Sequence, residues 1–168
     1  MPAIRQRITP FLWFDDQAEQ AATFYCAIFP DSRIDLVARY TKEAAQATGR
    51  EAGSAMTVEF VLDGQHFTAL NGGPHFQFNE AVSLVVHCAS QEEVDHYWNG
   101  LGEGADPGAQ QCGWLKDRFG LTWQVVPDEL IALLNDPDPE RGRRTMIEMM
   151  KMKKIDIASL RRAADGTD

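Results

Sequence analysis

The sequence is poor in cysteine and has no long apolar run, and each shortage excludes a class of protein. It contains three cysteines, Cys26, Cys88 and Cys112, in 168 residues. An odd number of thiols without close spacing suits neither a disulfide framework nor a zinc knuckle, and it fits a reducing compartment. No apolar run approaches the roughly 20 residues that a membrane span needs. We therefore expect a cytoplasmic protein without a membrane partner, in which the cysteines are small buried hydrophobes.

Positive charge is also scarce. Sixteen Lys and Arg stand against 25 Asp and Glu, which gives a formal net charge of −9. A protein that binds a phosphate backbone needs clustered Lys and Arg, so we expect no nucleic-acid partner. The length and the 44% apolar content suit a single domain, residues 1–168, whose halves share one core.

The first half of the chain, residues 8–71, has the pattern of a strand, a helix and three strands. Ile8–Phe14 is apolar and aromatic, as expected of a strand. Gln17–Phe29 has alanines and aromatics at helical spacing. Arg33–Tyr40 predicts the second strand, and two more strands surround the Asp63-Gly64 turn, which is a strong hairpin signal.

The second half, residues 82–135, repeats this order. "AVSLVVHCA" predicts a strand, Gln91–Leu101 a helix capped by Ser90, and Asp117–Gly120 the turn of a hairpin. We therefore predict an α+β fold of two tandem βαβββ units, joined by Asn71–Glu80. Each unit alone leaves one sheet face bare, so the two should form a curved mixed sheet around a cleft.

The C-terminal segment, residues 138–165, predicts a helical tail. It places Met146, Ile147, Met149 and Met150 on one side of a helix. A methionine stripe is more often packing than a cofactor site, so we expect it to cover the core or a dimer interface.

Four segments, in order, resemble the PhnB-like branch of the vicinal oxygen chelate superfamily. They are "ITPFLWFDDQAEQAATFYCAIFP", "GQHFTALNGGPHFQFNEAVSLVV", "CGWLKDRFGLTWQVVP" and "MMKMKKIDIASLRRA". The superfamily includes glyoxalases, ring-cleaving dioxygenases and bleomycin-resistance proteins, and members of this branch often carry the label demethylubiquinone methyltransferase. The resemblance implies a glyoxalase/dihydroxybiphenyl dioxygenase-like fold and a homodimer.

The resemblance also locates the positions at which metal-using members carry ligands. On the first strands these positions fall on Pro10 and on Ser83, or on Ala81 if the helix is counted one turn differently. On the last strands they fall on Thr68 and Gln124. Proline has no ligand atom in its side chain, and Thr and Ser are weak ligands for zinc or iron. We therefore expect no metal ion and no cofactor.

Strand alternation divides the side chains between the cleft and the helices. The predicted ligand-binding residues are those on the cleft side, together with a tryptophan at its rim: Phe14, Thr68, His87, Trp114 and Gln124. By the same alternation Phe11 and Trp13 should pack beneath the first helix. His87 is the candidate acid-base group, although a strand histidine bonded to backbone is an alternative. No residue is assigned a catalytic role.

The function predicted from these features is a metal-free protein or enzyme that acts on a small apolar or aromatic molecule. A metal-dependent lyase or oxygenase and a non-enzymatic interaction scaffold, with the methionine-rich tail recruiting a partner, are the alternatives. Common methyl transfer from S-adenosylmethionine uses a doubly wound sheet with a Gly-rich loop after the first strand. Asn71–Gly73 follows a hairpin strand and precedes no convincing helix, so the methyltransferase label rests on the resemblance alone.

Overall fold

The computed structural model describes residues 6–167, which divide into two compact units between Phe78 and Asn79. The division falls inside the predicted joining segment, Asn71–Glu80. The ends of the predicted domain, residues 1–5 and Asp168, lie outside the described part of the chain. Each unit is described by itself.

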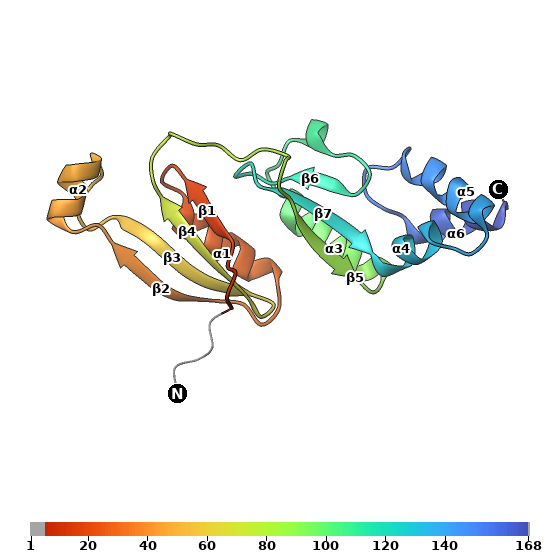
Figure 1. The fold of residues 1–168 in the computed structure, drawn as a ribbon, viewed down its shortest axis with the longest axis horizontal. Coiled ribbons are helices and arrows are strands. Elements are labelled where there is room, and N and C mark those ends of the chain that lie inside the picture. Colours follow the sequence, from red (N-terminus) through yellow and green to blue (C-terminus); the bar gives the residue numbers. More distant parts are fainter. Residues whose placement is uncertain (1–5, 168) are drawn as a thin grey trace. The chain divides into compact units, whose positions relative to one another are not determined.

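The first unit is a four-stranded sheet with one long helix against one face (Figure 1). Its elements are β1 Phe11–Phe14, α1 Ala18–Ile28, β2 Arg33–Arg39, α2 Lys42–Thr48, β3 Ala55–Leu62 and β4 Gln65–Asn71. The strands lie in the order β1-β4-β3-β2, with β1 parallel to β4 and the other pairs antiparallel. The polar segment Thr41–Gly53, for which the sequence predicts a loop or a short irregular helix, contains the regular helix α2.

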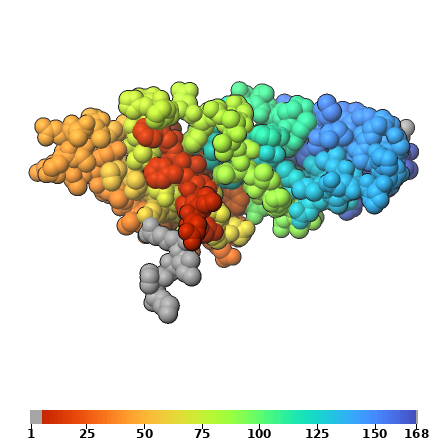
Figure 2. All heavy atoms as spheres, in the orientation of Figure 1, coloured from red at the N-terminus to blue at the C-terminus, as the bar shows by residue number. Residues whose placement is uncertain are grey.

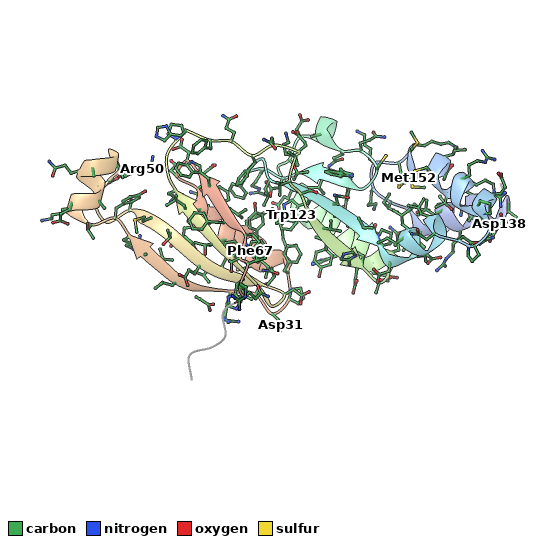
Figure 3. All side chains as sticks on the ribbon, in the orientation of Figure 1. Asp31, Arg50, Phe67, Trp123, Asp138 and Met152 are labelled. Atoms are coloured by element: carbon green, nitrogen blue, oxygen red, sulfur yellow. The ribbon has the colours of Figure 1, made fainter. Side chains whose placement is uncertain are left out.

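Alternate residues of β3 and β4 build the core under α1. Val58 and Phe60 on β3 pair with Ala69 and Phe67 on β4, and all four side chains are at most 6% exposed. Tyr25 of α1 lies above Phe60 with ring centroids 6.4 Å apart, and Phe60 stacks on Phe67 at 5.3 Å. Phe67 is labelled in Figure 3. Such aromatic contacts stabilise a core beyond the area that they bury, so this face of the sheet is fixed against the helix.

The second unit begins with a three-stranded sheet. Its elements are β5 Leu84–Cys88, α3 Gln91–Gly102, the 3-10 turn η1 Pro107–Ala109, β6 Trp114–Lys116 and β7 Thr122–Pro127. The strands lie in the order β5-β7-β6, with β5 parallel to β7. The two mixed sheets and their helices confirm the predicted α+β class.

The second unit has one strand fewer than predicted in its described residues, so its order is βαββ. The segment that should hold the missing strand contains Asp106, Pro107 and Gly108, and these form a 3-10 turn. The side chain of Asp106 accepts a hydrogen bond from Gly108 N at 2.8 Å. Proline and glycine beside a capping aspartate favour a turn over an extended ladder, which explains the difference.

Three further helices complete the second unit: α4 Asp128–Leu134, α5 Pro139–Met149 and α6 Ile157–Asp165. They enclose a cluster of buried side chains, formed by Leu130, Leu133, Ile155, Leu160 and Ala164. In Figure 2 the residues of α5 and α6, in blue, gather in one body. Helix α4 has apolar residues at helical spacing, but it was not predicted.

The methionine stripe is only partly core, and its role in covering a dimer interface stays a prediction. Met149 packs against the buried cluster. Met146, Ile147 and Met150 are 42%, 44% and 61% exposed. Met146 and Ile147 lie on α5 and Met150 is its C-cap, whereas the buried residues of this helix are Gly142 and Thr145.

Backbone hydrogen bonds attach this tail to the hairpin. Cys112 N donates to Met152 O at 2.8 Å, and Gly113 N donates to Lys153 O at 2.7 Å. Cys112 and Gly113 both have positive φ, 52° and 82°. A Cβ at Gly113 would lie 3.0 Å from the carbonyl oxygen of Val125, so glycine is required there by conformation and by space. The tail is therefore an integral part of the second unit.

Among the described residues, no helix combines the length and the apolar character needed to cross a membrane.

Candidate functional site

The sequence prediction for the first sheet is displaced by one residue along β1, so it assigns the β1 side chains to the wrong faces. Phe11 pairs with Thr68, and Phe14 pairs with Asn71. Side chains of paired residues lie on the same face. Phe14 is therefore on the α1 side, where it is 4% exposed, whereas Phe11 is 60% exposed on the open face with Thr68. The prediction that Phe11 and Trp13 pack beneath the helix is wrong, and Phe14 and Thr68 lie on opposite faces.

The error has a local cause. Three residues separate β1 from α1, but two separate β5 from α3. Counting back from the aligned helices therefore shifts one first strand against the other by one residue, and a shift of one residue exchanges the faces of a strand. Strand pairing gives the correct equivalence: Thr68 and Gln124 are opposite Phe11 and Val85. By the same count Ser83 corresponds to Thr9, not to Pro10.

The second sheet has the faces that strand alternation predicts. Val85 and Trp114 are both paired with Gln124, so these three side chains share a face, and His87 follows two residues after Val85. Val85 is 44% exposed, and Trp114 and Gln124 are partly buried. The opposite face carries Trp123, which is 3% exposed and is labelled in Figure 3. Of the five predicted ligand-binding residues, Thr68 thus lies on the open face of the first sheet, and three lie on the open face of the second sheet: His87, Trp114 and Gln124.

Gln124 and Ser83, two positions derived from the superfamily, lie within hydrogen-bond distance. Gln124 Nε2 donates to Ser83 Oγ at 2.8 Å. In the first unit the corresponding neighbours, Thr9 and Thr68, line one hollow of about 200 Å³. The geometry brings the paired positions together in each unit, although none of the four side chains is ionisable at neutral pH.

These residues do not fit a metal ion. A zinc or iron site needs three or four His, Cys or carboxylate ligands around one point. The paired positions offer hydroxyl groups and an amide, and no group of three His, Cys, Asp or Glu side chains converges anywhere in residues 6–167. We derive no chemistry through a metal here.

His87 lies at an exposed edge of the open face. Its Nδ1 is 3.7 Å from Asp128 Oδ1, with side chains 61% and 69% exposed. Exposed pairs of this kind contribute little to stability, about 0–1 kcal/mol. His87 is therefore accessible to a molecule on the open face and has a carboxylate beside it.

The prediction that the cysteines are buried is confirmed for Cys88 only, because Cys26 and Cys112 are partly exposed. Cys88 is fully buried on the α3 side of β5. Burial, with smaller contributions from Glu93 and Asp128, raises the pKa of the Cys88 thiol to about 12. Burial, followed by Asp35, also raises the pKa of Cys26. A raised pKa leaves the thiol protonated and unreactive at neutral pH.

Two buried polar residues organise the strands around the open faces. Asp117 is 4% exposed; its Oδ1 accepts from Phe119 N at 2.8 Å and from Leu121 N at 3.0 Å, and its Oδ2 accepts from Trp123 Nε1 at 2.8 Å. The Asp-x-x-Gly segment is thus a hydrogen-bonded turn. In the first unit, Asn71 Oδ1 accepts from Ala18 N at 2.8 Å and so caps α1.

Two residues of the hollow on the first sheet were not predicted. Glu59 of β3 pairs with Thr68, and His66 lies two residues before Thr68 on the same face. Both line the hollow together with Thr9, Phe67 and Thr68. Strand alternation assigns both to the open face once the register of the hairpin about Asp63-Gly64 is known.

Each unit therefore has a helix on one face of a mixed sheet, an open face with exposed apolar side chains, and a parallel pair formed by its first and last strands. These features define an α+β protein made of two tandem sheet units. Comparison with known proteins gives its family. A sequence model of the 3-demethylubiquinone-9 3-methyltransferase family matches residues 6–126, and the chain belongs to this family.

Solved structures agree with this assignment. The PhnB protein of Bacillus cereus is 31% identical to the chain, with a TM-score of 0.62, and the alignment covers 73% of this chain and 99% of that one. The protein PA1353 of Pseudomonas aeruginosa shares the fold at 19% identity, with a TM-score of 0.56 and coverage of 73% and 97%. No curated protein matches. Helices α4–α6 begin at Asp128, beyond the region that the family model matches.

Proposed function

We propose that this chain binds a small, largely apolar or aromatic molecule on the open faces of its sheets, and that it does so without a metal ion. The observation that carries this proposal is the face of the second sheet. There a neutral hydrogen-bonded pair, Gln124 and Ser83, lies beside the partly exposed side chains of Val85 and Trp114. Apolar surface with a few fixed polar groups is typical of small-molecule sites.

The chemistry of each side chain supports such a ligand. Trp114 offers a planar ring on which an aromatic ligand can stack. The amide of Gln124 can donate and accept, and its bond to Ser83 fixes its orientation. His87 could exchange a proton with a ligand group at the edge of the face. Phe14 is left out of this set, because its ring is buried under α1.

The family description names a methyltransferase, but the geometry of this chain supplies no argument for that reaction. The usual methyltransferase fold is a doubly wound sheet with a Gly-rich loop after its first strand. Here β1 and β5 are each followed by two or three residues and then a helix, and the first residues of those loops are Asp15 and Ala89. We therefore propose binding, and leave the reaction unassigned.

Two alternative functions were considered. A metal-dependent lyase or oxygenase is disfavoured, because the paired positions carry hydroxyl and amide groups. An interaction scaffold is favoured by one observation, the exposure of Met146, Ile147 and Met150 on α5.

A thermal-shift screen of metabolites tests the proposal. It should include quinone-like aromatics and S-adenosylmethionine, because a ligand that binds the native state raises the melting temperature by mass action. We expect an aromatic compound to raise it, and Gln124→Leu and His87→Ala to weaken that compound's binding. Gln20→Leu, at an exposed position of α1, is the control. If both site variants bind every hit as the wild type does, the proposed face is wrong.

We also propose that the protein is a cytoplasmic homodimer. The proposal rests on family resemblance and on the edge strands of the two sheets, β1 and β2 in the first and β5 and β6 in the second, which a partner could cover. Sedimentation equilibrium at micromolar concentration should give twice the chain mass of 18.8 kDa. A single species of monomer mass would contradict the dimer without affecting the ligand proposal.

A further inference from the structure

A basic hollow lies between helices α5 and α6 of the second unit, which contact each other (Figure 1). It holds about 230 Å³ and is lined by residues of both helices and of the turn after α6. Four of the lining residues are positively charged: Arg143, Arg144, Lys151 and Arg162. One lining residue, Glu148, is negatively charged. The excess of positive charge in a hollow of this kind attracts anions.

The segment around this hollow differs in charge from the rest of the chain. Residues 139–162 contain eight of the 16 Lys and Arg residues and three of the 25 Asp and Glu residues. Eight positive and three negative charges give this segment a net charge of +5, so the remainder of a chain of net charge −9 carries −14. The attraction for an anion is therefore confined to this part of the chain, which lies beyond the residues that the family model matches.

Two arginines of the hollow can bond an anion. A guanidinium has five N–H donors. Among the described residues, Arg162 uses one of them, since its Nη2 donates to Ser159 Oγ at 2.8 Å. Arg143 contacts Glu140 Oε2 through Nε and Nη2, both at 3.0 Å, and both side chains are more than half exposed. Exposed ion pairs are weak, so an incoming anion can share or replace the carboxylate.

Arg144 has a different role, at the end of α6. Its Nε donates to Ala163 O at 3.0 Å, and its Nη2 donates to Ala164 O. The last carbonyls of a helix carry partial negative charge, which would repel an anion. Arg144 offsets this charge and holds α5 against α6, so it shapes the hollow. Lys151, whose Nζ lies 2.8 Å from Glu148 Oε2 in an exposed pair, completes the basic lining.

An exposed apolar stripe adjoins the hollow. Ile147 lines the hollow and is 44% exposed. Met150 lies three residues after Ile147 and four after Met146, and residues at these spacings are neighbours on a helix surface. Methionine side chains are unbranched and adapt to apolar partners of varied shape. A ligand whose anionic group occupies the hollow could therefore place an apolar chain on this stripe.

We propose that the α5–α6 surface binds an anionic amphiphile, namely one molecule with a phosphate or carboxylate head on a flexible apolar chain. The head pairs with Arg143, Lys151 and Arg162, since guanidinium groups recognise both oxyanions through paired N–H bonds. The chain contacts Ile147 and Met150. A dispersed molecule fits better than an anionic bilayer, because the −14 carried by the rest of the chain repels an extended anionic surface. This site is separate from the sheet faces and does not depend on the proposed function.

Three probes separate the head of the ligand from its chain: octyl phosphate, octanol and inorganic phosphate. Each is titrated below micelle formation into the ¹⁵N-labelled full chain at low salt, and the amide shifts of Ile147, Lys151, Ala163 and Gly166 report the site. We expect octyl phosphate to bind about ten times more tightly than either octanol or inorganic phosphate, because only octyl phosphate makes both the charged and the apolar contacts. Its advantage over octanol should fall as salt rises.

Variants then assign the two kinds of contact to named residues. Arg143→Gln and Arg162→Gln should each weaken octyl phosphate binding and leave octanol binding unchanged, whereas Ile147→Gln should weaken both. Lys153→Gln is the matched control, because Lys153 is an exposed cation of the same segment and does not line the hollow. Should one arginine variant fail to fold, the other variant and the three probes on the wild type still decide the question.

Each other occupant of this surface has its own result. Equal affinity for octyl phosphate and octanol would overturn the anion site, and equal affinity for octyl phosphate and inorganic phosphate would overturn the role of the stripe. Co-sedimentation with phosphatidylglycerol vesicles, without any shift from dispersed octyl phosphate, would refute the single-molecule ligand in favour of a membrane surface. A wild-type dimer that Ile147→Gln converts to monomer would show that the stripe is an interface between copies, and the proposal would fail. Shifts confined to residues around Gln124 would refute this site and support the second sheet.

Discussion

Replacing Asp117 by alanine should destabilise the second unit strongly, because one buried carboxylate accepts three hydrogen bonds. Two of its donors, Leu121 N and Trp123 Nε1, are buried and would lose their acceptor. Each stranded buried donor costs about 1–3 kcal/mol. Relief from burying the carboxylate offsets part of this loss, so we expect about 3 kcal/mol. For a chain of this size that corresponds to roughly 6–12 °C in melting temperature.

The variant Asp117→Asn distinguishes the contribution of the hydrogen bonds within the turn from that of the bond with the Trp123 indole. The amide oxygen can still accept from the backbone of Phe119 and Leu121, but its NH₂ group would face the N–H of Trp123. The loss should be about half that of the alanine variant. Asp106→Ala is the control, because Asp106 is exposed and its side chain accepts a hydrogen bond from Gly108 N.

Equilibrium unfolding in urea, followed by tryptophan fluorescence and far-ultraviolet circular dichroism, measures these differences. A double-mutant cycle of Asp117→Asn with Trp123→Phe should show coupling of at least about 1 kcal/mol. If Asp117→Ala is no less stable than Asp106→Ala, or the cycle shows no coupling, the carboxylate does not hold the turn in the way the structure indicates.

Three further variants test separate contacts. Gly72→Ala should cost about 1–3 kcal/mol and change the fluorescence of Trp13, because the new Cβ would lie 2.2 Å from the Trp13 ring; unchanged emission would contradict this. Thr122→Val should leave stability unchanged or raise it by up to about 1 kcal/mol in urea unfolding, because the Thr122 hydroxyl is buried without a partner in the described residues. Asp156→Ala should cost about 1 kcal/mol at pH 7. The Asp156 pKa is lowered by Ser159, so this stabilisation is complete above the unfolded-state pKa and disappears as pH falls through the folded-state value; a loss that stays constant down to pH 3 would refute it.

Sequence patterns predicted the elements better than their register. The helix α3 was predicted as Gln91–Leu101 and observed as Gln91–Gly102, because a Ser90 cap and apolar spacing agree there. The face of β1 was wrong, since a connection one residue longer before α1 is invisible to an alignment that starts from the helix. Apolar residues occupy every position from Phe11 to Phe14, so alternation could not correct the slip.

The candidate sites show the same limit. Gln124 and Ser83 could be paired from strand parity, and the structure places them 2.8 Å apart. Glu59 and Thr68 become neighbours through the register of the β3–β4 hairpin. Thr9, which lines the same hollow, precedes β1 in the sequence. Neither His66 nor Glu59 belongs to a motif, so neither was predicted as a site residue.

The hydrogen bonds from Cys112 and Gly113 to Met152 and Lys153 also bear on the order in which the chain can fold as it is synthesised. The first unit ends at Phe78 and has its strand partners within its own residues, so it can complete its sheet while later residues are still being added. The second unit cannot, because its hairpin must wait about 40 residues for the carbonyls that accept those bonds. A ribosome that stalls between Pro127 and Met152 would therefore carry a finished first unit and an incomplete second one.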